Sequence, residues 1–415
     1  MSDLSQKLRR LGVTKGAQEL DGPQPPPKPA SYDEALPPGE NVETAFGVCF
    51  YIEERYPLDY AHGKSELAAL LTHDWGVAAQ MASPAQEKPL DLSRTLFIDT
   101  ETTGLGVGAG VLAFLIGAGY FENEAFVLRQ YFLRDPAEET AALHHLAEWG
   151  EGFDGLVSFN GRGFDVPLLR TRFVLSRLHP AILDAPHLDL LPPSRRVWRG
   201  RFESCALGTL EQRVLGVQRS QDDIMSWLIP DLYRQYLRGG DNGEMRQVLY
   251  HNAVDVLSMV VLAERLCRMF ADALGDDVDP RERVALAHWF EALGLSARAE
   301  KTYRAALDGW LPLDAQHTCL KNLAAMLKRQ DRRVEAVPLW LQWAMEDEGQ
   351  IEAHVELAKF YEWHEVELSK ALAWTKQALN VVGKWPRGLG RNTAKEELTH
   401  RRARLERKIS TSEAQ

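Results

Sequence analysis

The stretch that most constrains the fold is the apolar run 96–98, which leads into the two carboxylates Asp99 and Glu101. Side chains on a β-strand alternate between its faces, so residues two apart point the same way. Two carboxylates on one face repel each other unless one is protonated or a cation lies between them. Oxygen ligands suit Mg²⁺ or Mn²⁺. This strand end is therefore a candidate metal site, and the simpler alternative is a pair of solvated acids.

The length and composition set broad limits. A chain of 415 residues is long enough for two or three domains. The net charge of −11 argues against binding nucleic acid over the whole surface but allows a local basic face. The four cysteines are far apart and form no CxxC pair, as expected for thiols in a reducing cytoplasm. No run of about 18 apolar residues occurs, so we expect a soluble cytoplasmic protein.

The N-terminal segment contains seven prolines between residues 22 and 39. Proline fixes φ and lacks a backbone donor, so such a segment forms neither helix nor sheet. We expect residues 1–40 to be a flexible spacer, and a proline-rich ligand for a partner protein is the alternative.

From residue 95 the sequence alternates between strand-like and helix-like segments. The predicted strands are 95–99, 111–120, 125–133, 155–159 and 185–190, and the predicted helices are 136–149 and 164–178. An earlier strand candidate, 47–52, is expected to pack beside them. Only a short turn separates the second and third strands, as in a hairpin. We expect an α/β domain over residues 41–275, in which helices dominate after residue 207.

Two further acidic positions belong to this domain. Asp165 lies five residues after Asn160, where a turn would place it in the first turn of the next helix. There it would face the strand carboxylates, or it would only stabilise the helix N-terminus. His251 and Asp255 are four residues apart and share one helix face. Histidine titrates near neutral pH and can act as a general base; a plain contact along the helix is the alternative.

Together these residues suit hydrolysis of a phosphodiester. Four carboxylates can hold two cations about 3.5–4 Å apart, one activating water and the other stabilising the leaving oxygen. His251 would then accept the proton of the attacking water.

Three segments resemble the motifs of the DnaQ-like, or DEDD, 3′–5′ exonucleases, and more closely those of YprB-type ribonuclease H-like proteins. Residues 99–104 resemble the first motif, residues 160–165 the second, and Asp255 with its upstream histidine the third. The resemblance covers about residues 41–270. It implies a ribonuclease H-like fold with a mixed five-stranded sheet that begins with three antiparallel strands. It also implies two Mg²⁺ or Mn²⁺ ions on Asp99, Glu101, Asp165 and Asp255.

The third motif departs from the two main branches of that family, which use His-x₄-Asp or Tyr-x₃-Asp. His251 stands at the tyrosine spacing from Asp255, and Tyr250 stands at the histidine spacing. We favour His251 as the general base because tyrosine ordinarily titrates far above neutral pH. Tyr250 remains the alternative.

A basic segment follows the second motif. Between residues 160 and 220 ten arginines outnumber five acids, and the cluster 195–201 includes a tryptophan. Arginine pairs with phosphate in a bidentate manner, and tryptophan can stack on a base. A solvated loop is the alternative. The candidate nucleic-acid contacts are Thr102, Asn160, Arg162, Arg195, Arg196, Trp198 and Arg199.

After residue 280 the sequence indicates three helix pairs. Leu286, Leu323 and Leu357 are spaced by 37 and 34 residues, and two further series of small or apolar residues repeat similarly. This resembles tetratricopeptide (TPR) repeats over residues 281–382, whose concave surface usually binds a protein partner. Helices that only support the first domain are the alternative. The basic tail 383–415 either contacts nucleic acid or forms a solvated helix.

The sequence therefore predicts a metal-dependent nuclease, most simply a 3′–5′ exonuclease acting on single-stranded DNA or RNA. A structure-specific endonuclease with the same fold is an alternative, because fold alone does not determine the reaction. The non-enzymatic alternative is a scaffold that binds nucleic acid and a protein partner without cleaving either.

Overall fold

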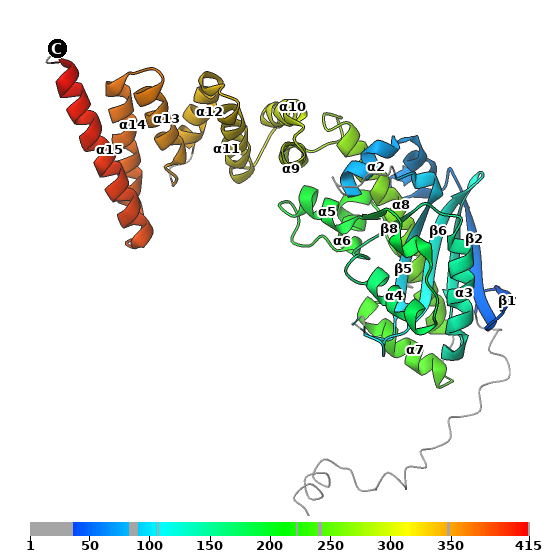
Figure 1. The fold of residues 1–415 in the computed structure, drawn as a ribbon. Helices are drawn as coiled ribbons and strands as arrows, with labels where there is room; N and C mark the ends of the chain where they lie inside the picture. Colours follow the sequence, from blue (N-terminus) through cyan, green and yellow to red (C-terminus); the bar gives the residue numbers. More distant parts are fainter. Residues whose placement is uncertain are drawn as a thin grey trace, which may run out of the picture. The chain divides into compact units, whose positions relative to one another are not determined.

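The computed structural model describes residues 36–82, 90–104, 106, 108–220, 223–239, 243–346 and 349–413 (Figure 1). The flexible segment expected at 1–40 lies almost entirely outside these residues. The chain forms two compact units. The first contains the residues up to Pro192 together with Ala206–Arg265, and the second contains Pro193–Cys205 together with Leu266–Gln415. The segment 193–205, which the sequence assigned to the first domain, thus belongs to the second unit.

The first unit is built on a seven-stranded mixed sheet with the strand order β1-β2-β7-β6-β5-β8-β9. The neighbours in the first part of this order, β1, β2, β7, β6 and β5, pair antiparallel. β8 and β9 continue the sheet parallel to β5. The strands are β1 Glu40–Thr44, β2 Gly47–Pro57, β5 Thr95–Thr102, β6 Ala113–Glu122, β7 Ala125–Phe132, β8 Gly155–Ser158 and β9 His187–Asp189. A two-stranded β-ribbon, β3 Ala61–His62 with β4 Ser65–Glu66, lies apart from this sheet.

The expected five-stranded sheet is too small by two strands. The five predicted strands form one continuous part of the sheet, and β2 and β1 extend it beyond β7. β2 buries its central residues Cys49 to Ile52 and pairs along β7, for example Tyr51 with Tyr131. This pairing satisfies the backbone groups that β7 would otherwise expose as an edge strand.

Helices cover the sheet, and α8 positions the candidate site. The helices are α2 Trp75–Ala82, α3 Glu139–Gly150, α4 Asp165–Leu175, α6 Leu207–Leu210, α7 Ile229–Leu237 and α8 Gly243–Ala271. α5 Leu191–Trp198 belongs mostly to the second unit. α8 lies so close to β6 that a Cβ at Gly117 would come within 2.2 Å of Asn252, and one at Gly119 within 2.6 Å of Val256. Glycine at these two positions allows the helix to approach the sheet.

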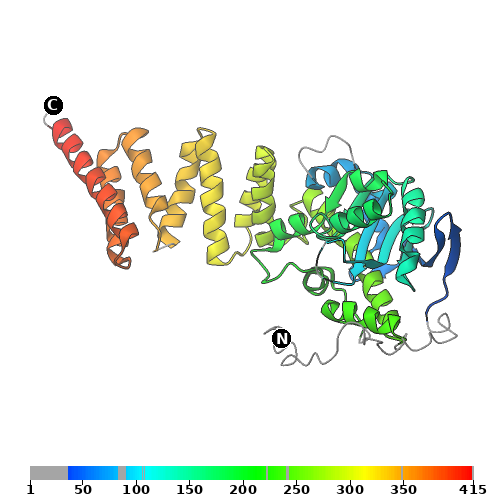
Figure 2. The ribbon, with the colours of Figure 1, turned by 60° about the horizontal axis from the view of Figure 1, so that its bottom comes forward.

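The second unit consists mainly of successive antiparallel helices (Figure 2). They are α9 Pro280–Ala292, α10 Ser296–Leu307, α11 Leu313–Arg329, α12 Arg333–Glu346, α13 Glu352–Trp363, α14 Leu368–Lys384 and α15 Leu389–Glu413. The repeating positions Leu286, Leu323 and Leu357 are each 0% exposed. The predicted helix pairs and their buried positions are confirmed, whereas the assignment to TPR repeats stays a prediction. α15 packs against α14, so the basic tail is part of this unit.

The structure corrects one expectation in the second unit. Trp198 is 0% exposed, and its indole Nε1 donates a hydrogen bond to Glu282 Oε1 at 2.8 Å. A ring buried in this way cannot stack on a nucleic-acid base. The four cysteines are free thiols. No helix among the described residues is both long and apolar enough to cross a membrane.

Candidate active site

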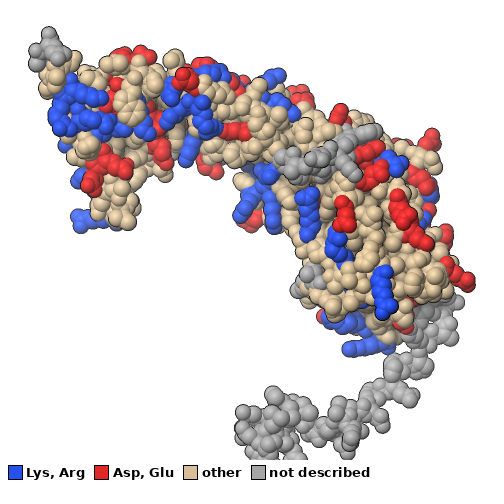
Figure 3. Space-filling view, viewed as in Figure 1, with Lys and Arg blue, Asp and Glu red and all other residues tan. Residues whose placement is uncertain are grey.

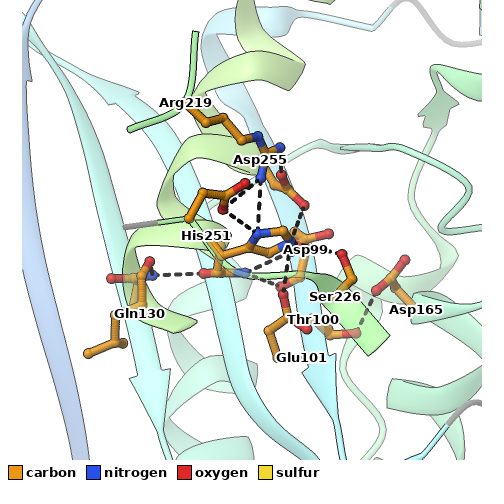
Figure 4. A network of polar contacts seen from close by, with 12 residues as sticks. Asp99, Thr100, Glu101, Gln130, Asp165, Arg219, Ser226, His251 and Asp255 are labelled. Carbon is orange, nitrogen blue, oxygen red and sulfur yellow. Dashed lines mark hydrogen bonds and ion pairs between the residues drawn. The ribbon is translucent and has the colours of Figure 1, made fainter. Parts of the chain in front are cut away.

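Asp99 and Glu101 lie on the last part of β5, and their neighbours on the next strands are in register with them. Asp99 pairs with Gly117 on β6, which in turn pairs with Gln130 on β7. These three positions therefore form a row across the sheet, on the face that α8 covers. Figure 4 shows Asp99, Glu101, His251 and Asp255 close together.

Asn252 of α8 connects this row. It is 0% exposed, and its Nδ2 donates a hydrogen bond to Asp99 Oδ2 at 2.8 Å. Gln130 Nε2 donates to Asn252 Oδ1 at 2.8 Å, and also to the carbonyl oxygen of Leu249. Gln130 thereby fixes the orientation of the Asn252 amide, because the oxygen of that amide must face β7 and its nitrogen Asp99.

The second motif forms a turn that presents Asp165 at the start of α4. Asn160 adopts the left-handed conformation with φ 66°. Asp189 accepts hydrogen bonds from the backbone N–H groups of Asn160 at 2.8 Å and Arg162 at 3.1 Å. Asp189 therefore holds the turn in place. Thr100 Oγ1 donates to Asp165 Oδ1 at 2.5 Å, which links this carboxylate to β5.

The third motif places His251 among the acidic side chains. His251 Nε2 lies 3.9 Å from Glu101 Oε1 and 3.7 Å from Asp255 Oδ2. Its Nδ1 lies 2.7 Å from Asp223 Oδ1. The hydroxyl of Tyr250 instead accepts a hydrogen bond from the backbone N–H of Ser220 at 2.9 Å. Of the two candidate bases, His251 is thus the one whose ring contacts the carboxylates.

Arg219 is a member of this cluster that sequence analysis did not identify. Its guanidinium donates two hydrogen bonds to Glu211, each 2.6 Å long, and another to Asp255. It also approaches Asp223 and His251. Burial opposes the charged form, but the hydrogen bonds to Glu211 and the charge of Asp255 raise the pKa of Arg219 overall. Arg219 is therefore a permanent cation among several carboxylates (Figure 4).

The four predicted carboxylates all have raised pKa values. Burial and the charges of Asp255 and Asp165 raise the pKa of Asp99 well above its ordinary value. Burial and the charge of Asp99 do the same for the pKa of Glu101. Burial raises the pKa of Asp165 to about 6, although Thr100 opposes this shift, and burial also raises that of Asp255. One cation, Arg219, does not neutralise the cluster.

The donor atoms of this cluster determine which metal ion it suits. Within the described residues, no group of three His, Cys, Asp or Glu side chains is already arranged to hold a metal. The chemistry of the donors nevertheless fits a hard cation, because all four predicted ligands offer carboxylate oxygens. A dication between them would also reverse the raised pKa values by favouring the charged forms.

The predicted nucleic-acid contacts are distributed over both units. Thr102 is buried and donates a hydrogen bond to the carbonyl oxygen of Gly104, so its side chain stabilises the end of β5. Asn160 and Arg162 are exposed beside Asp165 in the first unit. The other three arginines, Arg195, Arg196 and Arg199, are exposed in the second unit.

The fold and the site define a class of protein. Residues 96–267, which include all four carboxylates and His251, match the RNase H superfamily. The chain therefore contains an RNase H superfamily domain. Over 423 aligned residues it is 29% identical to a protein named "Uncharacterized protein YprB" from Bacillus subtilis (strain 168), with 98% of each chain covered. The similarity extends over both units and so includes the helical one.

Proposed function

We propose that this protein is a metal-dependent nuclease, and specifically a 3′–5′ exonuclease that acts on single-stranded DNA or RNA. One observation carries the proposal. Three segments far apart in the sequence bring four carboxylates and His251 to one end of β5, and the pKa values of these carboxylates are raised. Perturbed titratable groups that gather in this way are typical of catalytic sites. The direction of degradation is supported only by the resemblance of the three motifs.

Each residue has a defined part in the proposed reaction. Asp99, Glu101, Asp165 and Asp255 would hold two Mg²⁺ or Mn²⁺ ions, which activate water and stabilise the leaving oxygen when bound. His251 Nε2 faces two of these carboxylates and would accept the proton of the attacking water.

Other groups position the reacting ones. Asn252 orients Asp99, and Asp223 at Nδ1 of His251 holds the imidazole ring in place. The exposed Asn160 and Arg162 would contact the phosphate backbone beside Asp165. Three further arginines of the second unit are also proposed to contact nucleic acid, namely Arg195, Arg196 and Arg199.

The second unit is proposed to bind a partner as TPR repeats do. A cavity of about 560 Å³ lies between α5, α9 and α11 and is lined by Arg196, Arg201, Arg281 and His288 together with apolar side chains. A concave surface formed by helix pairs is a common binding site for a protein segment. This partner stays a prediction.

The proposed activity is tested with 3′- and 5′-labelled single strands of DNA and RNA, and with a circular single strand. The incubations contain Mn²⁺, Mg²⁺ or EDTA. We expect metal-dependent loss of the linear strands from the 3′ end, and no loss with the variant Asp99→Asn. Glu122→Gln, which changes a carboxylate with a 42% exposed side chain at the far end of β6, is the matched control and should stay active.

The outcomes separate the alternatives. Cleavage of the circle would replace the exonuclease by an endonuclease. Binding without cleavage under every metal condition would instead support the scaffold. Full activity of Asp99→Asn would contradict the assignment of the site itself.

A further inference from the structure

One buried carboxylate in the second unit holds three cations. The side chain of Glu362 on α13 is 0% exposed. It accepts hydrogen bonds from Arg401 at 3.0 Å, from Arg404 at 2.7 Å and from Lys408 at 2.8 Å, all on α15. A single carboxylate neutralises one of these charges, so the contact region between α13 and α15 keeps an excess of positive charge.

The next face of α13 continues this basic region. A small cavity of about 110 Å³ is lined by Lys328, Arg333, Trp340, Glu356, Lys359, Phe360, Trp363 and His364. Lys328 and Lys359 share the carboxylate of Glu356. The guanidinium of Arg401 lies 5.4 Å from the centre of the Trp363 ring, so the cavity and the Glu362 cluster adjoin.

We name the whole region the α13–α15 basic surface. Its six cations are Lys328, Arg333, Lys359, Arg401, Arg404 and Lys408. Three carboxylates oppose them, namely Glu356, Glu362 and Asp331, the last of which pairs with Arg333. The net charge of these nine side chains is +3. Figure 3 shows Lys and Arg side chains gathered over these helices.

We propose that the α13–α15 basic surface binds single-stranded nucleic acid, as a second contact for the strand that the nuclease site degrades. Trp363, which is 52% exposed among the cations, supplies a face on which a base can stack. Cations beside an exposed aromatic ring are the combination that binds single strands with little sequence preference. The inference rests on the proposed function for its ligand, since the nuclease site requires the same polymer.

The arrangement allows a test that preserves the fold. In the double variant Lys359→Ala/Lys408→Ala, Glu356 keeps Lys328, and Glu362 keeps Arg401 and Arg404. No buried carboxylate loses its last partner. The matched control is Arg304→Ala/Arg329→Ala, two exposed arginines that pair with other acids of the same unit. A third variant, Trp363→Ala, tests stacking by itself.

Binding of a fluorescent 20-nucleotide single strand to the full chain is measured by anisotropy in EDTA, so that no cleavage occurs. We expect the Lys359→Ala/Lys408→Ala variant to bind about 10-fold more weakly at moderate salt. Its slope of log K against log salt should be shallower by about 1.4, because two phosphate contacts are lost. Trp363→Ala should weaken binding with little change in that slope, and the control should bind as the wild type does.

Equal binding by the wild type and the lysine variant would overturn the inference, and so would equal losses in the control. A labelled poly-glutamate peptide is titrated in parallel. If the peptide binds as tightly as the oligonucleotide and loses affinity in the same variant, the surface binds acidic protein segments and the inference fails. The proposed nuclease is judged separately by metal-dependent cleavage with Asp99→Asn, so each of the two ideas can fail without the other.

Discussion

Two charge clusters of opposite composition occur in this protein. In the first unit, the single cation Arg219 contacts Glu211, Asp223 and Asp255, beside the further carboxylates of β5. In the second unit, the single carboxylate Glu362 contacts three cations of α15. The first cluster has too few positive charges and the second too few negative ones, so each is suited to a ligand of the opposite sign.

The clusters also differ in how well water reaches the charges in excess. The side chain of Glu211 is 1% exposed, whereas the cations around Glu362 are 14% to 44% exposed. Burial raises the pKa values of the β5 carboxylates. Burial acts in the same direction on Glu362, but the hydrogen bonds from Lys408 and Arg404 outweigh it and lower the pKa of this carboxyl. Electrostatic repulsion between like charges is large only where the side chains are buried and cannot turn toward solvent.

The largest effect on stability is expected for Arg219→Met. This variant leaves Glu211 buried without its cation, which should lower the free energy of unfolding at pH 7 in EDTA by about 3–5 kcal/mol. Urea denaturation measures this loss. Arg55→Met, which removes an arginine that is 48% exposed, is the control and should cost less than about 1 kcal/mol. Equal losses in the two variants would remove the distinction between buried and exposed pairs.

The next effect concerns pH in the metal-free protein. Asp165 has a pKa of about 6 in the folded chain and an ordinary value near 3.8 when unfolded. Between these values the folded state binds more protons, so the free energy of unfolding falls as pH rises from about 4 to above 6. Asp165 contributes about 3 kcal/mol to this fall. Asp165→Asn should flatten the pH profile in EDTA; an unchanged slope would mean that Asp165 is not strained.

Asn252→Leu is expected to weaken metal binding by about 10- to 100-fold, because Asp99 loses the donor that orients it. A titration with Mn²⁺ followed by thermal unfolding measures this change. Ser258→Ala on the same helix removes a hydrogen bond to His62 and should lower stability without altering Mn²⁺ affinity. If both variants lose only stability, Asn252 has a purely structural role.

The smallest effect is expected at the basic cluster. Glu362→Gln leaves three cations that can turn toward water, so it should lower the free energy of unfolding by only about 1–2 kcal/mol. The loss should shrink in high salt, which screens repulsion between exposed charges. Denaturation at 50 mM and 500 mM salt tests this expectation. A loss as large as that of Arg219→Met, independent of salt, would contradict the comparison.

Much of the framework was predictable because its signals are local. The alternation of strands and helices from residue 95 depends on short spacings, and Leu286, Leu323 and Leu357 recur at a regular interval of 34 to 37 residues. The strand candidate 47–52 was not assigned to the sheet, because β2 joins it only through its pairing with β7, 68 to 80 positions further along the chain. β1, which pairs only with β2, was not predicted.

The candidate site was predictable only in part for the same reason. The four carboxylates lie in short motifs, and the resemblance to a known family identified them together. The contact of Arg219 with Asp255 spans 36 positions and that of Gln130 with Asn252 spans 122, and nothing in the sequence next to either residue indicates these contacts. The prediction that Trp198 stacks on a base was wrong. It relied on the arginines around Trp198 in the sequence, whereas the indole donates a hydrogen bond to Glu282.

The contact of Trp198 with Glu282 has a consequence for synthesis of the chain. The two residues are 84 positions apart, and at about 5–20 residues per second the ribosome needs roughly 4–17 s to make the second after the first. During this interval the strands have been made and α8 is being made, but the indole has no hydrogen-bond partner on α9. A chain terminated near residue 275 never gains this partner.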